Sequence, residues 1–460
     1  MCSRGGEQAH IPRVLSVSAA TELHITARVG SVQSGARKPD EDGDPMLVEL
    51  FPQVHQRYTS LPVLGTTMED FARFLLERGY PVGPIRRHIR TARKVDAGLR
   101  RRGARSFAEV TRARLRACGP PPGRSQDDEH VASTTRVLEA HLDRMGLFAA
   151  DPPVASPTAV MLSDYRQHLA QVHGMATSTI HQHVVTASAF LAHACGGQEL
   201  ERLSALTAAR IEDFVKQSGQ RLGRESLQHT VGQLRSFLRF LALRGEAPCG
   251  LDSQIDMPRV YGGERLPRSL PWETVTRLLA SIDRSTALGR RDHAMFLLFA
   301  TYGLRTSDIV QLKLEDIDWR AGRLRVHQLK TATPLELPLT DEVATSLVKY
   351  LRHGRPALSH REIFVRHCAP AGVLKRAGVS SAFRAWSARS GLGIPFQGPH
   401  CLRHSFAVRL LRKGVSLKAI GDVLGHRTMA STTVYLRLAV EDLRGVALDL
   451  PDGRQRRSAR

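Results

Sequence analysis

The sequence has no hydrophobic run long enough to cross a membrane. No uncharged apolar stretch reaches the ~18 residues that indicate a spanning helix, and the N-terminal residues lack the basic start and apolar centre of a secretory signal. Cysteine is also scarce, because the six cysteines are scattered along the chain and none forms a CxxC pair. We therefore expect a cytoplasmic protein with reduced thiols and no membrane partner.

Acidic residues are too few to balance the basic ones. Asp and Glu total 44 against 66 Lys and Arg, which gives a formal net charge of +22. An excess of this size suits a polyanionic partner, although ribosome-binding and membrane-surface proteins share it, as do proteins of Arg-rich, high-GC genomes. Hydrophobic residues make up 42% of the chain, as in ordinary globular domains, and a length of 460 residues suggests two or three such domains.

Turn-forming residues divide the chain into segments. Residues 1–45 show no sustained periodicity, and we interpret them as a disordered tail or as the product of an upstream start site. Prolines mark two linkers, CGPPPGRSQDDEH at 118–130 and the stretch 246–271. The predicted segments are a helical basic N-terminal extension at 46–125, a helical domain at 131–250, a linker at 251–270, a mixed domain at 271–450 and a basic tail at 451–460.

The positive charge is concentrated in the N-terminal extension. Twelve basic residues lie between Arg86 and Arg116, and only Asp96 and Glu109 oppose them, so this stretch carries +10 of the total. Charge this one-sided favours phosphate binding over a merely solvated helix face. A weak internal similarity between residues 85–92 and 180–187 suggests two related helical clamp modules. The candidate phosphate-contacting residues are Arg86, Arg87, Arg90, Arg93, Lys94, Arg235 and Arg239.

The mixed domain predicts helices around one small sheet. Residues 274–282 and 292–303 have the apolar pattern of helices. Residues 317–339 instead predict three short strands, with turns at Ala321–Gly322 and near Thr331–Pro334. The predicted fold class is therefore mainly α with a small antiparallel β-sheet, in a chain of several domains.

Four segments of the mixed domain resemble the catalytic domain of the tyrosine recombinase, or phage integrase, family in order, spacing and local context. The resemblance is strong over residues 270–445 and looser over 150–250, which would be the family's SAM-like core-binding domain. It implies an enzyme of the nucleoid that cuts and rejoins double-stranded DNA at specific sites as a homotetramer, without a cofactor. The long N-terminal part favours a mobile-element enzyme, whereas the sequence does not separate integrase, transposon recombinase, plasmid resolvase and chromosome-dimer resolution roles. The segments are TYGLRTSDIVQLKLEDIDW (301–319), HQLKTATPLELPL (327–339), HCLRHSFAVRLL (400–411) and IGDVLGHRTMASTTVYLRL (420–438).

Two arginines in these segments suit a phosphodiester. A guanidinium donates two parallel hydrogen bonds to phosphate oxygens and keeps its charge at any working pH. Arg305 follows a predicted helix and a glycine turn, and Arg403 lies on a helix that begins near Pro399. If both converge on one phosphate, they neutralise the charge that builds as five oxygens crowd the phosphorus.

Two histidines share the helix of Arg403. His400 lies three residues before Arg403 and therefore on the same helix face. We interpret His400 as a base or hydrogen-bond partner for the attacking hydroxyl, and His404 as a residue that caps or orients its neighbours. His400, Cys401 and His404 also look like metal ligands, but no further ligand cluster accompanies them, so we expect no metal site.

Three further residues complete the catalytic candidates. Gly425 suits a left-handed helix end that aims His426 at a phosphate oxygen. The resemblance places the family's catalytic lysine, the general acid for the departing 5′-oxygen, at Lys330 on a hairpin tip. It also makes Tyr435 the nucleophile that forms a 3′-phosphotyrosine, and we expect nearby cations to favour its phenolate. The candidates are Arg305, Lys330, His400, Arg403, His426 and Tyr435.

Two other classes of function stay open. A type IB topoisomerase shares this chemistry but relaxes supercoils without choosing a site, whereas a silent accessory protein would bind DNA without cutting it. Two positions depart from the family's pattern: Cys401 stands where an acidic residue is common, and Asp308 where Glu is common. Neither position is catalytic, so both departures leave the predicted activity unchanged.

Overall fold

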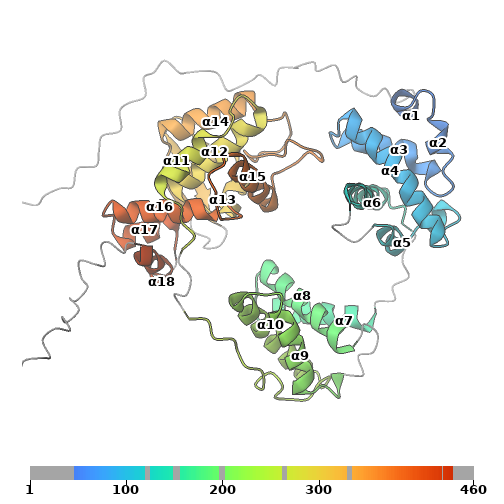
Figure 1. Ribbon diagram of the computed structural model, residues 1–460, viewed down its shortest axis with the longest axis horizontal. Helices are drawn as coiled ribbons and strands as arrows, with labels where there is room; N and C mark the ends of the chain where they lie inside the picture. The colour runs from blue at the N-terminus through green and yellow to red at the C-terminus, as the bar shows by residue number, and fades with distance from the viewer. Residues whose placement is uncertain are drawn as a thin grey trace, which may run out of the picture. The chain divides into compact units, whose positions relative to one another are not determined.

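The computed structural model describes residues 46–119, 125–148, 156–195, 203–261, 267–328, 334–426 and 428–438 (Figure 1). These residues are mostly helical and their strands form one three-stranded antiparallel sheet, which confirms the predicted fold class. No helix within these ranges is long and apolar enough to span a membrane. The chain divides between His55 and Gln56 into two compact units, and the smaller contains α1 (Met46–Leu50).

Helices α2 to α6 follow His55 and pack on one another. α4 buries an apolar stripe that recurs every three or four residues, including Ile85, Ile89 and Leu99. Asp96 is also buried, and its carboxylate accepts hydrogen bonds of 3.0 and 2.9 Å from the backbone N–H groups of Val63 and Leu64. The elements are α2 (Gln56–Thr59), η1 (Gly65–Thr67), α3 (Met68–Glu77), α4 (Val82–Arg101), η2 (Phe107–Glu109), α5 (Arg112–Ala117) and α6 (Gln126–Arg144).

Helices α7 to α10 share a separate apolar cluster. Tyr165 is fully buried within it, and its hydroxyl forms hydrogen bonds of 3.0 Å with His183 and 3.1 Å with Ser236. These bonds satisfy a polar group that would otherwise be costly to bury. The elements are α7 (Pro157–Gln171), α8 (Thr177–Cys195), α9 (Ala208–Gly219) and α10 (Arg224–Leu243).

The remaining elements surround the small sheet. Leu324 on the central strand pairs with Ile317 on one side and Leu337 on the other, and all three side chains are buried. The sheet therefore turns one apolar face to the core, as the alternating pattern predicts. The elements are α11 (Trp272–Ala280), α12 (Ala287–Tyr302), α13 (Thr306–Gln311), η4 (Leu314–Asp316), β1 (Ile317–Asp318), β2 (Arg323–His327), β3 (Pro334–Pro338), α14 (Asp341–His353), α15 (Arg376–Arg389), α16 (His400–Arg412), α17 (Leu417–Leu424), α18 (Ala430–Thr433) and η5 (Val434–Leu438).

Helix α16 joins two apolar clusters. Leu402 packs in the large core with α12 and the sheet, whereas Phe406 packs in a smaller cluster with Leu424 and Tyr435. Because α16 and α12 are in direct contact, the end of α12, the start of α16 and the end of α17 lie close together. The four segments singled out by the sequence contribute to this meeting point.

Two predicted linkers contain packed structure. Residues 126–130, predicted as linker, begin α6, and this helix packs against α3, α4 and α5 rather than starting a new domain. Leu251 and Ile255 lie in the predicted linker 251–270 but belong to the apolar cluster of α7–α10. Polar and turn-forming residues are equally common in linkers and in helix starts or packed loops, so composition alone misplaced these boundaries. The predicted tails, 1–45 and 451–460, lie outside the described residues.

Candidate active site

Arg305 lies at the start of α13, directly after the turn that ends α12. Gly303 makes this turn in the left-handed region, with φ of 62°, where a β-carbon would also lie 2.6 Å from the Phe406 ring. The Arg305 guanidinium donates to the backbone oxygen of Gly425 at 2.9 Å and to the Gln328 side chain at 3.3 Å. Its only partly exposed side chain, at 16%, is therefore held in place before any ligand is bound.

Asp308 supports Arg305 from one turn further along α13. Its carboxylate is buried, lies 4.0 Å from the Arg305 guanidinium and accepts a hydrogen bond from the Arg305 backbone N–H. Burial raises the pKa of this carboxyl, while Arg305 and Arg403 act in the opposite direction. Asp308 thus pairs with Arg305 through both its guanidinium group and its backbone N–H.

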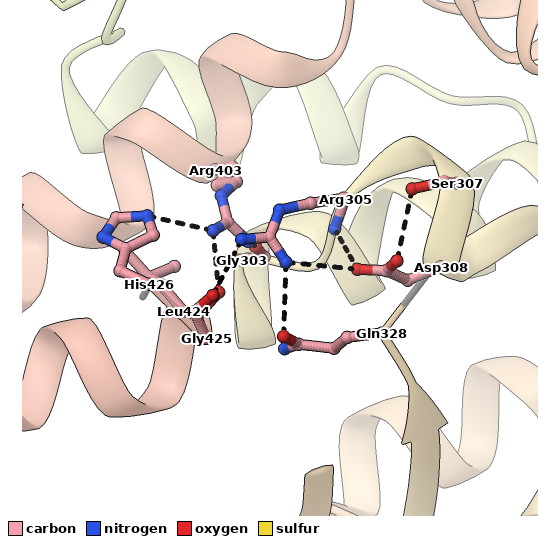
Figure 2. Close-up of polar contacts among 9 residues, drawn as sticks. All are labelled: Gly303, Arg305, Ser307, Asp308, Gln328, Arg403, Leu424, Gly425 and His426. Carbon is pink, nitrogen blue, oxygen red and sulfur yellow. Dashed lines mark hydrogen bonds and ion pairs between the residues drawn. The ribbon is translucent and has the colours of Figure 1, made fainter. Parts of the chain in front are cut away.

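Arg403 is buried, at 3% exposure, in the first turn of α16. Its guanidinium donates to the backbone oxygens of Gly303 and Leu424, the latter at 2.8 Å. Burial, followed by the charge of Arg305, lowers its pKa to about 10, so it stays protonated at neutral pH. Figure 2 shows the two guanidinium groups side by side, next to the backbone oxygens of Leu424 and Gly425.

His426 follows the left-handed end of α17, as predicted. Gly425 has φ of 62°, and a β-carbon there would lie 1.9 Å from the Gln328 side chain, so only glycine fits without a shift. The His426 Nε2 atom lies 3.2 Å from the Arg403 guanidinium, and Nδ1 lies 2.8 Å from the hydroxyl of the buried Thr432. The turn at Gly425 therefore places the His426 imidazole next to the guanidinium group of Arg403 (Figure 2).

Tyr435 lies in η5, a short 3-10 helix. Only 2% of its surface is exposed, and its ring stacks against that of His426 with centroids 6.4 Å apart. Its hydroxyl lies 3.1 Å from Nδ1 of His404. His404 was predicted only to cap or orient its neighbours, and the structure shows that the neighbour it contacts is the candidate nucleophile.

The protonation state of Tyr435 depends on two opposing effects. Burial raises the pKa of its phenol above the ordinary value, although the charges of Arg403 and Arg305 act to lower it. Both cations favour the phenolate, as we predicted, but desolvation outweighs their effect in the protein without DNA. The phenol is therefore neutral at working pH and needs a proton acceptor before it can attack.

His400 and Lys330 are less directly described. His400 is exposed in the first turn of α16, and its ring meets that of His404 edge-on with centroids 4.5 Å apart. Lys330 lies outside the described residues. Gln328, two residues earlier, is buried and contacts Arg305. The roles given to the six candidates therefore remain predictions. The structure brings four of these residues close together, namely Arg305, Arg403, His426 and Tyr435.

The geometry of the α16 histidines does not support a metal site at His400, Cys401 and His404. Burial raises the pKa of the Cys401 thiol to about 12, and this thiol bonds to the Gly398 oxygen. Within the described residues, no group of three or more His, Cys, Asp or Glu side chains is placed to hold a metal ion. His404 bonds instead to Tyr435.

The basic candidates on α4 are exposed, but some of their charge is paired with acidic residues. On α4, Lys94 forms an ion pair of 2.7 Å with Asp127 on α6. α6 also pairs with the basic residues of α5, through Glu139 and Asp143. These acids follow the basic stretch in sequence, so counting charge between Arg86 and Arg116 missed them. The charge is less one-sided than predicted.

The two candidates on α10 differ from each other. Arg235 is partly buried, and its Nε donates to the backbone oxygen of Asp252 at 2.7 Å, which ties the loop after α10 to the helix. Arg239 is exposed, with its Nε 4.0 Å from the Asp252 carboxylate. Arg235 therefore has a structural partner that a DNA phosphate would have to compete with, whereas Arg239 is accessible.

Comparisons with known proteins decide the family. The model of the phage integrase family matches residues 268–442. A putative integrase/recombinase of Sinorhizobium fredii, y4rA, is 33% identical over 391 residues, which cover 83% of this chain and 93% of that protein. The chain belongs to the tyrosine recombinase, or phage integrase, family. It is a tyrosine-type recombinase enzyme of site-specific DNA recombination.

Two further comparisons extend this assignment beyond the catalytic region. The tyrosine recombinase XerD of Listeria monocytogenes is 29% identical over 294 residues, covering 62% of this chain and 96% of that protein. A crystal structure of the XerH site-specific recombinase, bound to its palindromic difH substrate after cleavage, matches with a TM-score of 0.50 and 18% identity. That match covers 62% of this chain and 83% of the XerH chain, and it supports the fold.

Proposed function

We propose that this recombinase cleaves and rejoins double-stranded DNA through a 3′-phosphotyrosyl bond to Tyr435. The observation that carries the proposal is the convergence of two guanidinium groups, one imidazole and one phenol from separate segments. Arg305 donates a hydrogen bond to the backbone oxygen of Gly425, and Arg403 donates one to that of Leu424. The charges of both arginines act to lower the pKa of the Tyr435 phenol. Two adjacent cations repel each other, so an anion between them is stabilised strongly.

The scissile phosphate is the anion that fits this arrangement. Arg305 and Arg403 each offer planar pairs of N–H donors, which match the oxygens of a phosphodiester. His426 adds a third donor when its Nε2 is protonated. Because these groups are held by backbone carbonyls and by Thr432 before DNA binds, little reorganisation is needed as negative charge builds on the phosphorus.

The reaction conserves the phosphodiester energy. The oxygen of Tyr435 attacks phosphorus, the bond to the 5′-oxygen breaks, and Lys330 supplies a proton to that leaving oxygen. His400, one turn before His404 on α16, assists the attacking hydroxyl as a base or hydrogen-bond partner. A 5′-hydroxyl from the partner duplex then attacks the phosphotyrosine and reverses each step, so exchange of strands needs no ATP.

The remaining parts of the chain supply affinity. DNA is contacted by the exposed basic residues of α4 and by Arg239 on α10, while a homotetramer on paired sites brings the two duplexes together. We place the protein on the nucleoid and its gene in a mobile element. Inverted repeats in the DNA beside the gene would support that placement, and a gel-filtration mass of one protomer on paired-site DNA would contradict the tetramer.

The decisive test uses nicked duplexes that tile the DNA flanking the gene, in which loss of a short product traps the covalent adduct. The wild-type chain is expected to form a protease-sensitive adduct on at least one duplex, and Tyr435→Phe none. Tyr350→Phe is the matched control, because Tyr350 is equally buried but stacks on Phe364. Adduct formation by Tyr435→Phe contradicts the proposal, as does binding by the wild type without any adduct.

A further inference from the structure

His404 is the imidazole that touches the candidate nucleophile. Its Nδ1 lies 3.1 Å from the Tyr435 hydroxyl, within hydrogen-bond range, and the two ring centroids are 5.6 Å apart. Both groups are held by packing: His404 is half-buried on α16, and Tyr435 is 2% exposed in η5. The sequence offered no reason to connect them, because 31 residues separate the two.

The surroundings of His404 keep it neutral in the protein without DNA. Burial, and then the charges of His400, Arg403, Arg268 and His426, lower its pKa to about 4. These groups come from α16, from the segment before α11 and from the end of α17. A neutral imidazole with its proton on Nε2 has a lone pair on Nδ1, which can accept the phenol's proton.

We propose that His404 is a catalytic residue, the immediate proton acceptor for Tyr435 during DNA cleavage. This inference rests on the proposed function. As the bond between the Tyr435 oxygen and phosphorus forms, the phenol's proton moves to Nδ1 of His404, and the bond to the 5′-oxygen breaks. The leaving oxygen takes its proton from Lys330. In rejoining, the attacking 5′-hydroxyl gives its proton to Lys330 as its oxygen bonds to phosphorus, and the released Tyr435 oxygen takes its proton back from His404, so both half-reactions balance.

DNA itself prepares His404 for this role. The scissile phosphate brings negative charge to Arg305, Arg403 and His426, and so offsets the cations that disfavour a proton on His404. Its pKa then rises from about 4, although burial, the largest cause of the lowered value, still acts on it. Without DNA, the same cations and the burial of Tyr435 leave both groups neutral and unreactive. Proton transfer thus becomes favourable only when the substrate is in place.

His404 is better placed for this step than His400. The described contact to the phenol oxygen is made by His404, whereas His400 is exposed and meets the His404 ring edge-on. His400 remains a partner of the attack, either as a donor to the phosphate or as the next group along the proton's path.

Two substitutions at His404 separate proton acceptance from positioning. His404→Asn places an amide oxygen or nitrogen near the position of Nδ1, so it keeps a hydrogen bond to Tyr435 but cannot accept a proton. His404→Phe keeps the ring packing and removes both. Equal melting temperatures and equal DNA affinity would show that each variant is folded. Where His404→Phe fails this control, His404→Asn carries the test.

The measurement is the single-turnover rate of adduct formation on the nicked duplex, followed against pH. For the wild type we expect a rate that rises with pH and then levels off as His404 loses its proton. In His404→Asn the rate should fall about 100-fold or more, as is usual for loss of a general base, and the rise with pH should disappear. A wild-type rate, or a slow rate with an unchanged pH profile, contradicts the inference.

A second substrate distinguishes attack from departure. A duplex with sulfur in place of the bridging 5′-oxygen has a leaving group that needs no protonation, so it rescues variants of the general acid. We expect this duplex to rescue Lys330→Ala but not His404→Asn. Rescue of His404→Asn would assign His404 to the leaving group and overturn the inference. Failure of the proposed function is separate, because it appears as adduct formation by Tyr435→Phe.

Discussion

The protein treats its arginines in opposite ways at the active site and on α4. At the site, the guanidinium groups of Arg305 and Arg403 are buried or nearly so and are fixed by backbone carbonyls. On α4, the basic side chains are exposed, and Lys94 forms an ion pair with an acidic residue of α6. Arg112 and Arg116 on α5 also pair with acidic residues of α6. Buried cations cost desolvation and must be compensated, whereas exposed ones are hydrated and screened by salt.

We therefore expect the buried cations to contribute to catalysis and the exposed cations to contribute to DNA affinity. Fixed cations beside a neutral phenol create a field that acts on one phosphate, so their loss should slow the reaction with little effect on binding. Exposed cations contribute charge that any phosphate can use, so their loss should weaken binding without changing the rate on bound DNA. Three of the predictions that follow test the two halves of this comparison, and one concerns the stability of the catalytic region.

The largest effect is expected for Arg403→Lys. Lysine keeps the positive charge but cannot bond to the Gly303 and Leu424 oxygens while offering paired donors to phosphate. Loss of one aligned donor at a developing charge costs about 10²–10³ in rate, and we expect a single-turnover cleavage rate reduced by this factor. DNA affinity, measured by fluorescence anisotropy, should change less than about threefold. A loss of DNA affinity as large as the loss of cleavage rate would contradict the claim that this buried cation acts on the rate rather than on binding.

Gly425→Ala should have the next largest effect. The new β-carbon would lie 1.9 Å from the Gln328 side chain at φ of 62°, so Gln328 must move away from Arg305. Misplacement of this kind costs up to about 10²-fold in rate, and we expect a loss of about tenfold. Adding Gln328→Ala should recover part of it.

Gly322→Ala is the matched control for Gly425→Ala. Gly322 has a similar φ of 60°, but nothing lies within 4 Å of the added β-carbon. Both variants should lose about 1 kcal/mol of stability from backbone strain, yet only Gly425→Ala should cleave slowly. Equal cleavage rates for the two variants would argue that the turn at Gly425 does not position the site.

Acid should destabilise the catalytic region through its buried histidines. Burial lowers the pKa of His293 to about 4, below the ~6.5 of the unfolded chain. The unfolded state therefore binds more protons in this window, so the free energy of unfolding falls as pH drops from about 6.5 toward 4. His293→Asn, which can keep the bond to Ser346, should reduce this loss by about 1–2 kcal/mol between about pH 7 and pH 5. Urea unfolding at both pH values measures it, and an unchanged pH dependence would contradict the prediction.

The smallest effect is expected on α4, where Arg93 and Lys94 are adjacent. Both are exposed, but Lys94 pairs with Asp127, while no described acidic side chain forms an ion pair with Arg93. Arg93→Gln should lower DNA affinity by severalfold and reduce the slope of log affinity against log salt by about 0.9. Lys94→Gln should do less of both. A larger effect at Lys94 would show that the ion pair opens when DNA binds.

The sequence predicted the parts of the site that depend on local backbone. Gly303 and Gly425 end helices in the left-handed region, and these turns place Arg305 and His426 at the site. Arg403 lies on the predicted helix after Pro399. These features are encoded within a few residues, so a motif carries them completely.

Features that depend on distant packing were missed. The contact between His404 and Tyr435 depends on how η5 docks on α16, and the raised pKa of Tyr435 depends on burial that no local pattern records. The acids of α6 neutralise charge on α4 and α5 only because these helices pack together. Charge counts and motifs describe neighbours along the chain, whereas desolvation and ion pairing are set by neighbours in space.

The account depends on Tyr435 being the atom that bonds to DNA, and one measurement addresses that bond directly. The adduct trapped on a nicked flanking duplex can be digested with protease and nuclease, and the peptide that carries the residual nucleotide sequenced by mass spectrometry. We predict a single modified peptide with the nucleotide phosphate on Tyr435. A nucleotide on any of the other six tyrosines of the chain, or on a serine, would contradict the central claim.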